Sequence, residues 1–229
     1  MISPRVNANT FTRPRLLSEY VYEQLKDLIL KNQLPPGEAL IEEKLASQWG
    51  ISRTPLRAAL TRLEKDGLVK TIPHRGCLVT DITAADVRDV YQAREALEVM
   101  TTLLATPHIP DAELDEMARL FDRIEADLAQ DNYDSYIPSD ALFHAMILRY
   151  VANRVLLEML ERIYNQITRI RNLSHDQPGA HMREAFNEHR VILAALKRRD
   201  AQAASEAMRQ HIHGVTRRAI IILEARQAA

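Results

Sequence analysis

Residues 50–63 read GISRTPLRAALTRL, and this stretch decides the fold of the first third of the chain. Its leucines Leu56, Leu60 and Leu63 recur at the spacing of one helical face, so they predict a helix with a buried apolar stripe. Ser52 stands just before that helix, where a hydroxyl side chain can cap free backbone N–H groups. The stretch therefore predicts a helix that packs on one side and leaves its first turns exposed on the other.

The exposed side of this helix carries Arg53, Thr54 and Arg57. A preceding helix is expected over 41–49, and Gly50 can end it in a left-handed turn. Two helices joined by a short turn, with arginine in the first exposed turns of the second, are typical of a helix-turn-helix. Such a recognition helix places its N-terminal end in the DNA major groove, where arginine bonds to guanine and hydroxyls reach bases or phosphates.

Two short strands are expected after the recognition helix, over 68–72 and 77–80, around the tip Pro73-His74-Arg75-Gly76. A basic hairpin tip beside a recognition helix is typical of a wing, which lies along the minor groove or the phosphate backbone. Arg75 would meet the negative potential of DNA there. With a first helix that begins near Ser18, the pattern predicts a winged helix-turn-helix of three helices and a small β-hairpin.

The chain is expected to consist of an arm and two domains: a flexible arm over 1–14, the winged domain over 15–80 and a second domain over 81–229. Residues 1–80 hold 12 Lys and Arg against 8 Asp and Glu, a net charge of +4, whereas the remainder has a net charge of −5. The basic part is the one that suits a polyanionic partner.

The sequence also bears on the compartment. No apolar run approaches the ~20 residues that cross a bilayer, and the N-terminus lacks the apolar centre of a signal peptide. The single cysteine, Cys77, cannot form an internal disulfide and suits a reducing compartment. We therefore expect a cytoplasmic protein with no membrane partner.

The second domain is predicted to be entirely helical. Thr83 with Asp86 three residues later resembles a capping box that opens its first helix. Apolar periodicity and breakers then predict helices over 83–105, 111–130, 138–151, 153–173, 179–197 and 200–226. The fold class is therefore mainly α: a winged helix-turn-helix followed by a bundle of six or seven helices.

Four polar residues of the bundle are candidates for a metal site. Asp140 and His144 lie four residues apart on one helical face, among apolar neighbours. Antiparallel packing of the last two helices would bring His189 and His211 to a similar height. One carboxylate and three imidazoles suit Zn²⁺, Ni²⁺ or a related divalent ion, with coordination positions left for an oxygen ligand. The alternative is that each histidine is an ordinary surface or core residue.

The N-terminal motifs strongly resemble the DNA-binding domain of GntR-family regulators. The matching residues are PGxxL at 36–40, LA at 45–46, GISRTPLRxALxRLExDGLV at 50–69 and RGxxV at 75–79. The resemblance implies that the positions touching operator DNA are Ser52, Arg53, Thr54, Arg57, His74, Arg75 and Gly76. Where some relatives have an arginine in the second helix, this chain has Glu43, to which we assign no DNA contact.

The C-terminal motifs look like the FCD effector domain of the FadR subfamily. They are DxxxH at 140–144, NxxL at 153–156, EHxxIxxALxxxDxxxA at 188–204 and MxxHI at 208–212. The resemblance is to the group that keeps its aspartate and three histidines as metal ligands. It implies that Asp140, His144, His189 and His211 bind the ion. The FadR fatty acyl regulator itself lacks this metal arrangement, so its ligand specificity does not transfer.

Arg94 and Glu98 resemble a recurring element of the first FCD helix. An arginine directed inward would pair with a carboxylate of the effector in a fork geometry. The alternative is an i,i+4 ion pair on the helix surface.

The expected function is a ligand-responsive, homodimeric transcriptional regulator, with repression as the expected outcome. It would bind a palindromic double-stranded DNA operator, and a small carboxylate effector held at a metal ion would modulate that binding. Two alternatives stay open: a metal-dependent hydrolase, for which no general base is identifiable near the ligand set, and a regulator for which the ion itself is the signal.

Overall fold

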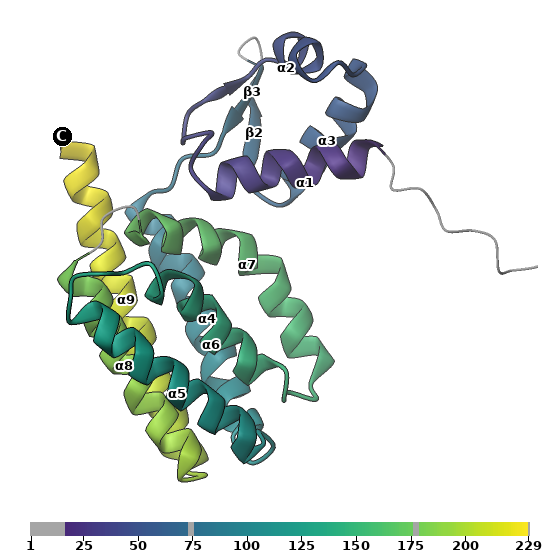
Figure 1. The fold of residues 1–229 in the computed structure, drawn as a ribbon. Helices are drawn as coiled ribbons and strands as arrows, with labels where there is room; N and C mark the ends of the chain where they lie inside the picture. Colours follow the sequence, from purple (N-terminus) through teal and green to yellow (C-terminus); the bar gives the residue numbers. More distant parts are fainter. Residues whose placement is uncertain (1–16, 73–75, 176–178, 229) are drawn as a thin grey trace, which may run out of the picture. The chain divides into compact units, whose positions relative to one another are not determined.

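The computed structural model describes residues 17–72, 76–175 and 179–228 (Figure 1). The chain divides into two compact units, with the boundary between Thr80 and Asp81. The arm expected over 1–14 lies outside the described residues. Each unit has a core of its own, so each is described by itself.

The N-terminal unit is a helix-turn-helix with a wing. Its helices and strands are α1 (Leu17–Leu30), β1 (Ala39–Leu40), α2 (Glu42–Trp49), α3 (Arg53–Lys65), β2 (Val69–Ile72) and β3 (Gly76–Val79). The sheet is antiparallel with the order β1-β3-β2, and Val69 pairs with Val79 while Leu40 pairs with Cys77. The two wing strands agree with the prediction, whereas β1 was not expected.

The turn between α2 and α3 depends on Gly50. Its φ of 63° is in the left-handed region, and its backbone N–H bonds to the carbonyls of Ala46 and Ser47 at the end of α2. A residue without a Cβ adopts this conformation at little cost. Ser52 precedes α3 as predicted, but its hydroxyl makes no capping hydrogen bond to the described part of that helix.

The predicted leucine stripe of α3 forms the centre of the first core. Leu56 and Leu63 are fully buried and Leu60 is nearly so. They pack with Leu25 of α1, which is also fully buried. The core fixes the inner face of α3, and the opposite face with its arginines is left exposed. Trp49 only borders this core and is half-buried.

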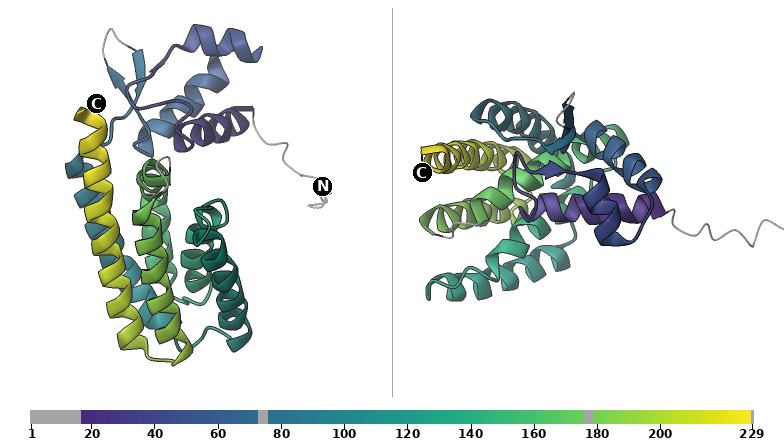
Figure 2. Two further views of the ribbon diagram at one scale, coloured as in Figure 1. Left: turned by 60° about the vertical axis from the view of Figure 1, so that its left-hand side comes forward. Right: turned by 90° about the horizontal axis from the view of Figure 1, so that it is seen from above.

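The C-terminal unit is an all-helical domain. Six helices occur among its described residues: α4 (Ala84–Ala105), α5 (Asp111–Leu128), α6 (Tyr136–Leu148), α7 (Arg154–His175), α8 (Ala180–Lys197) and α9 (Ala201–Ala228). Helix α9 packs against both α4 and α8, and α8 and α9 run side by side in Figure 2. Helix α6 begins two residues before Pro138, because proline is accommodated in the first turn of a helix.

The predicted capping box at the start of α4 is present. The Thr83 hydroxyl accepts a hydrogen bond from the Asp86 backbone N–H, and an Asp86 carboxylate oxygen accepts one from the Thr83 backbone N–H. These bonds satisfy two backbone donors at the helix terminus and define the first residue of the C-terminal bundle.

We expect Thr83→Ala to lower the free energy of unfolding of the C-terminal unit by about 1 kcal/mol, because the capping hydroxyl is lost. Thermal unfolding followed by circular dichroism measures this change. Thr83→Ser keeps the hydroxyl and should unfold close to wild type. Equal midpoints for the alanine variant and wild type would contradict the role of the cap.

No helix in the described ranges is long and apolar enough to span a membrane.

Candidate metal centre and DNA-reading surface

Three helices of the C-terminal unit bring the four candidate ligands together. Asp140 and His144 lie one turn apart on α6, His189 is on α8 and His211 is on α9. The three histidines offer ring nitrogens that all lie within 4.8 Å of one another. The Nε2 atoms of His189 and His211 are 3.2 Å apart, and Asp140 Oδ1 is 3.6 Å from His189 Nε2.

All four side chains are buried in the core of the bundle. The ring of His189 packs against Phe143, with 4.8 Å between the ring centroids. Burial holds the pKa of His189 well below its usual range, and the neighbouring His211 lowers it further. Burial, followed by His144, likewise holds the pKa of His211 far below normal. Both rings are therefore neutral at pH 7, which is the form of imidazole that binds metal ions.

Carboxylates fix the orientation of two of the histidines. Glu98 of α4 lies 2.6 Å from His144 Nδ1, and Glu188 of α8 lies 2.9 Å from His211 Nδ1. An ionised carboxylate only accepts hydrogen bonds, so the network assigns the proton of each ring to Nδ1. Each Nε2 then carries the lone pair: that of His211 lies 3.2 Å from His189 Nε2, and that of His144 lies 3.1 Å from Arg94 Nη2. This carboxylate–histidine pairing accompanies the metal sites of many proteins.

Arg94 is buried and forms an ion pair with Glu98, with 2.5 Å between Arg94 Nε and Glu98 Oε1. Burial alone would raise the pKa of Glu98, but Arg94 and His144 outweigh it, so the pKa lies below its ordinary value and the carboxylate is ionised. The pair has the i,i+4 spacing expected of a surface ion pair, but both side chains are buried. Arg94 Nη2 also lies 3.1 Å from His144 Nε2, which places the guanidinium beside the candidate centre.

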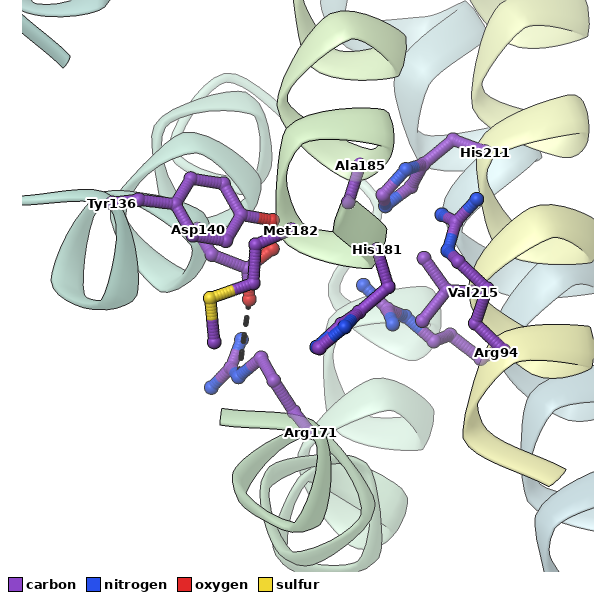
Figure 3. Close-up of a pocket in the computed structure, with 10 residues that line it drawn as sticks. Arg94, Tyr136, Asp140, Arg171, His181, Met182, Ala185, His211 and Val215 are labelled. Carbon is purple, nitrogen blue, oxygen red and sulfur yellow. Dashed lines mark ion pairs between the residues drawn. The ribbon is translucent and has the colours of Figure 1, made fainter. Parts of the chain in front are cut away.

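A small cavity adjoins this cluster (Figure 3). Its volume is about 30 Å³, and its lining residues are Arg94, Tyr136, Asp140, Arg171, His181, Met182, Ala185, His211, Val215 and Arg218. Arg171 Nε lies 3.3 Å from Asp140 Oδ2, the ion pair drawn in Figure 3. Arg218 donates two hydrogen bonds to the Glu188 carboxylate, of 2.7 and 2.6 Å. The cavity therefore joins the candidate ligands to several guanidinium groups.

The donor set fits a divalent ion of the zinc or nickel type. Three imidazoles and one carboxylate converge from three helices, and in two of the rings a carboxylate bonds to Nδ1. An ion between His189 and His211 would replace the direct contact of their Nε2 atoms. The orienting roles of Glu98 and Glu188 were not predicted from the sequence, although each lies within four residues of a candidate site residue.

The candidate DNA contacts lie on the exposed face of α3. Ser52, Arg53, Thr54 and Arg57 are all exposed. Arg53 Nη2 lies 2.7 Å from Glu43 Oε1, and Arg57 Nε lies 2.6 Å from a carboxylate oxygen of Glu42 on the same helix, α2. Both arginines are thus paired on the protein surface.

The wing contributes the remaining candidate contacts. Gly76 begins β3 with a φ of 80°, a left-handed conformation that suits glycine. His74 and Arg75 lie outside the described residues. The structure therefore places five of the seven candidate DNA-contact residues.

Comparison with known proteins agrees with this architecture. Residues 17–79 match bacterial regulatory proteins of the gntR family, and residues 89–214 match the FCD domain. The uncharacterized HTH-type transcriptional regulator YdhC of Bacillus subtilis is 31% identical over 84% of this chain and 86% of its own. The HTH-type transcriptional repressor GlaR of Escherichia coli is 30% identical over 83% of this chain and 90% of its own.

A solved structure shares the fold over most of the chain. McbR/YncC of Escherichia coli covers 93% of this chain and 99% of its own, with a TM-score of 0.72 and 23% identity. A winged helix-turn-helix joined to a helical FCD domain defines a regulator of transcription. The chain belongs to the GntR family, which confirms the resemblance seen in its motifs. Its relatives are regulators of transcription, so the hydrolase alternative is wrong.

Proposed function

We propose that this GntR-family regulator is a homodimeric repressor whose affinity for a palindromic operator is modulated by a small organic acid at a divalent metal ion. The observation that carries the proposal is the buried convergence of three histidines, Asp140 and two orienting carboxylates in the FCD domain. A domain that served only to join two DNA-binding units would gain nothing from burying so many polar groups.

The ligands of the ion would be Asp140 Oδ1 and the Nε2 atoms of His144, His189 and His211. When bound, the ion supplies a Lewis acid that can bind an anionic oxygen of the effector. Arg94 lies beside the His144 ring and lines the cavity, so its guanidinium is placed to bond to a carboxylate of that effector.

Charge balance favours an acid over a neutral effector. Three ion pairs surround the cavity: Arg94 with Glu98, Arg171 with Asp140, and Arg218 with Glu188. Arg218 also lies 3.2 Å from Glu184, whose side chain is exposed. Because these pairs cancel and the rings of His189 and His211 are neutral, a divalent ion would add positive charge to a buried place. An anionic ligand offsets that charge, and the small size of the cavity favours a small ligand.

Dimerisation is supported by apolar side chains on the surface of the FCD domain. Met100 and Leu104 of α4 are 44% and 38% exposed, and Val155 and Met159 of α7 are 57% and 49% exposed. Helices α4 and α7 pack against each other, and each carries two of these exposed apolar side chains. A second copy would cover them, and a symmetric dimer matches a palindromic operator.

The test measures operator affinity by fluorescence anisotropy with full-length protein in metal-free, zinc-loaded and nickel-loaded forms. Each form is titrated with small carboxylates and with the matched neutral amides, such as lactate and lactamide. We expect at least one acid, but not its amide, to change operator affinity about tenfold, and only in a loaded form. A response to the metal alone would make the ion the signal. Protein purified without chelators that holds no divalent ion would contradict the proposal.

A further inference from the structure

Gly214 stands inside α9, where glycine is a poor choice. It is buried and lies near the middle of a helix that runs from Ala201 to Ala228. The other glycines of the chain occupy turns, a helix cap or the start of a strand. Because glycine destabilises the interior of a helix, a buried glycine there commonly has a packing role: the missing side chain leaves space for a neighbouring group.

The neighbours of Gly214 show what it makes room for. A Cβ atom at this position would lie 2.5 Å from Glu188 Oε1, and 2.9 and 3.2 Å from the two terminal nitrogens of Arg218. The closest atoms are thus the charged ends of two side chains, and the backbone of α8 is not among them. The atoms that a Cβ would meet first are therefore the ends of these side chains.

These charged groups hold His211 in place through hydrogen bonds. Glu188 accepts two hydrogen bonds from Arg218 and one from His211 Nδ1. Residues 211, 214 and 218 share one face of α9, so the carboxylate lies across the helix surface directly above the glycine. A methyl group there would force the ends of Glu188 and Arg218 to move, and Glu188 is the residue that bonds to His211.

We propose that Gly214 is a positioning residue for the metal centre: the missing side chain lets Glu188 reach His211 and hold its Nε2 toward the other ligands. This inference rests on the metal site of the proposed function. It adds a residue that is no ligand and makes no hydrogen bond through a side chain, yet sets the orientation of a ligand one turn away.

The test is Gly214→Ala in the full-length protein, with two readouts. Competition with a chromogenic chelator gives the dissociation constant for Zn²⁺, which we expect to rise about 10- to 100-fold, the usual effect of losing an orienting partner. Nitrogen-15 NMR of the histidine rings in metal-free protein reports the tautomer of His211, and we expect its Nδ1-protonated form to lose population.

Two further variants separate positioning from a general effect on the helix. His213→Ala also places alanine in this turn of α9, but His213 is exposed and bonds to Glu95, so metal affinity should match wild type. In a Glu188→Ala background the carboxylate is gone, so adding Gly214→Ala should weaken metal binding no further.

Each outcome decides the proposal. Wild-type metal affinity and an unchanged tautomer in Gly214→Ala would overturn it, as would additive losses in the double variant. If wild-type protein binds no metal, the proposed function fails, and the tautomer of His211 alone decides whether Gly214 positions that ring.

Discussion

The double substitution Arg53→Ala with Arg57→Ala is expected to lower operator affinity by about 100- to 10,000-fold. Both side chains project from the exposed N-terminal turns of α3. An arginine that bonds to a base contributes ~1–3 kcal/mol, and each 1.4 kcal/mol is a tenfold change in affinity. Electrophoretic mobility shift or anisotropy titration with the operator measures the loss.

A matched control removes the same charge elsewhere in the DNA-binding unit. Lys65 and Lys70 are exposed, but they lie at the end of α3 and on β2, away from the first turns. Lys65→Ala with Lys70→Ala should weaken operator binding far less, because only the general attraction to DNA is reduced. The FCD domain is untouched in both variants, so dimerisation and metal content should match wild type. Operator affinity within threefold of wild type in the arginine variant would refute the assignment.

Replacing His189 with alanine is expected to weaken binding of Zn²⁺ by about 100- to 1,000-fold. Structural zinc sites bind with about 10–16 kcal/mol over four ligands, so one ligand accounts for roughly 3 kcal/mol. His189 lies between Asp140 and His211, and its loss removes the ring nearest to both. Metal content after dialysis and chelator competition measure the change.

The same variant separates sensing from DNA binding. Because His189 belongs to the C-terminal unit, operator affinity without effector should stay near that of metal-free wild type, while the response to the acid should disappear. His108→Ala is the control, since His108 is exposed and lies outside the cluster. Unchanged metal affinity in the His189 variant would exclude that ring as a ligand.

Local patterns predicted most of the fold, because they depend on residues close in the chain. The leucine stripe of α3, the left-handed Gly50 and the Thr83 capping box are each set within a few residues. Strand β1 was not predicted, because two residues are too few to show a periodic pattern. The strand is defined by its pairing with β3. The start of α6 at Tyr136 was not predicted, because a proline indicates the first turn of a helix but not which position of that turn it occupies.

The four candidate ligands were proposed from the sequence, whereas the contacts of Glu98 and Glu188 with two of them were not. His144 and Glu98 are 46 residues apart, and nothing local shows which face of α4 meets α6. Arg94 illustrates the same limit: its spacing to Glu98 was correctly recognised, but i,i+4 pairs are common on surfaces, and only packing against α6 and α9 buries this one. The room at Gly214 likewise depends on how α8 lies against α9.

The carboxylates of α2 that pair with Arg53 and Arg57 give the DNA-reading surface an internal competitor. If these arginines contact bases as proposed, their bonds to Glu42 and Glu43 would compete with that contact, and the carboxylates would lie near phosphates that repel them. Random DNA, which offers mainly phosphate attraction, compensates this exchange poorly, whereas a cognate site does so through base contacts. Two acidic residues that touch no base would therefore widen the gap between operator and bulk genome, at the expense of absolute affinity.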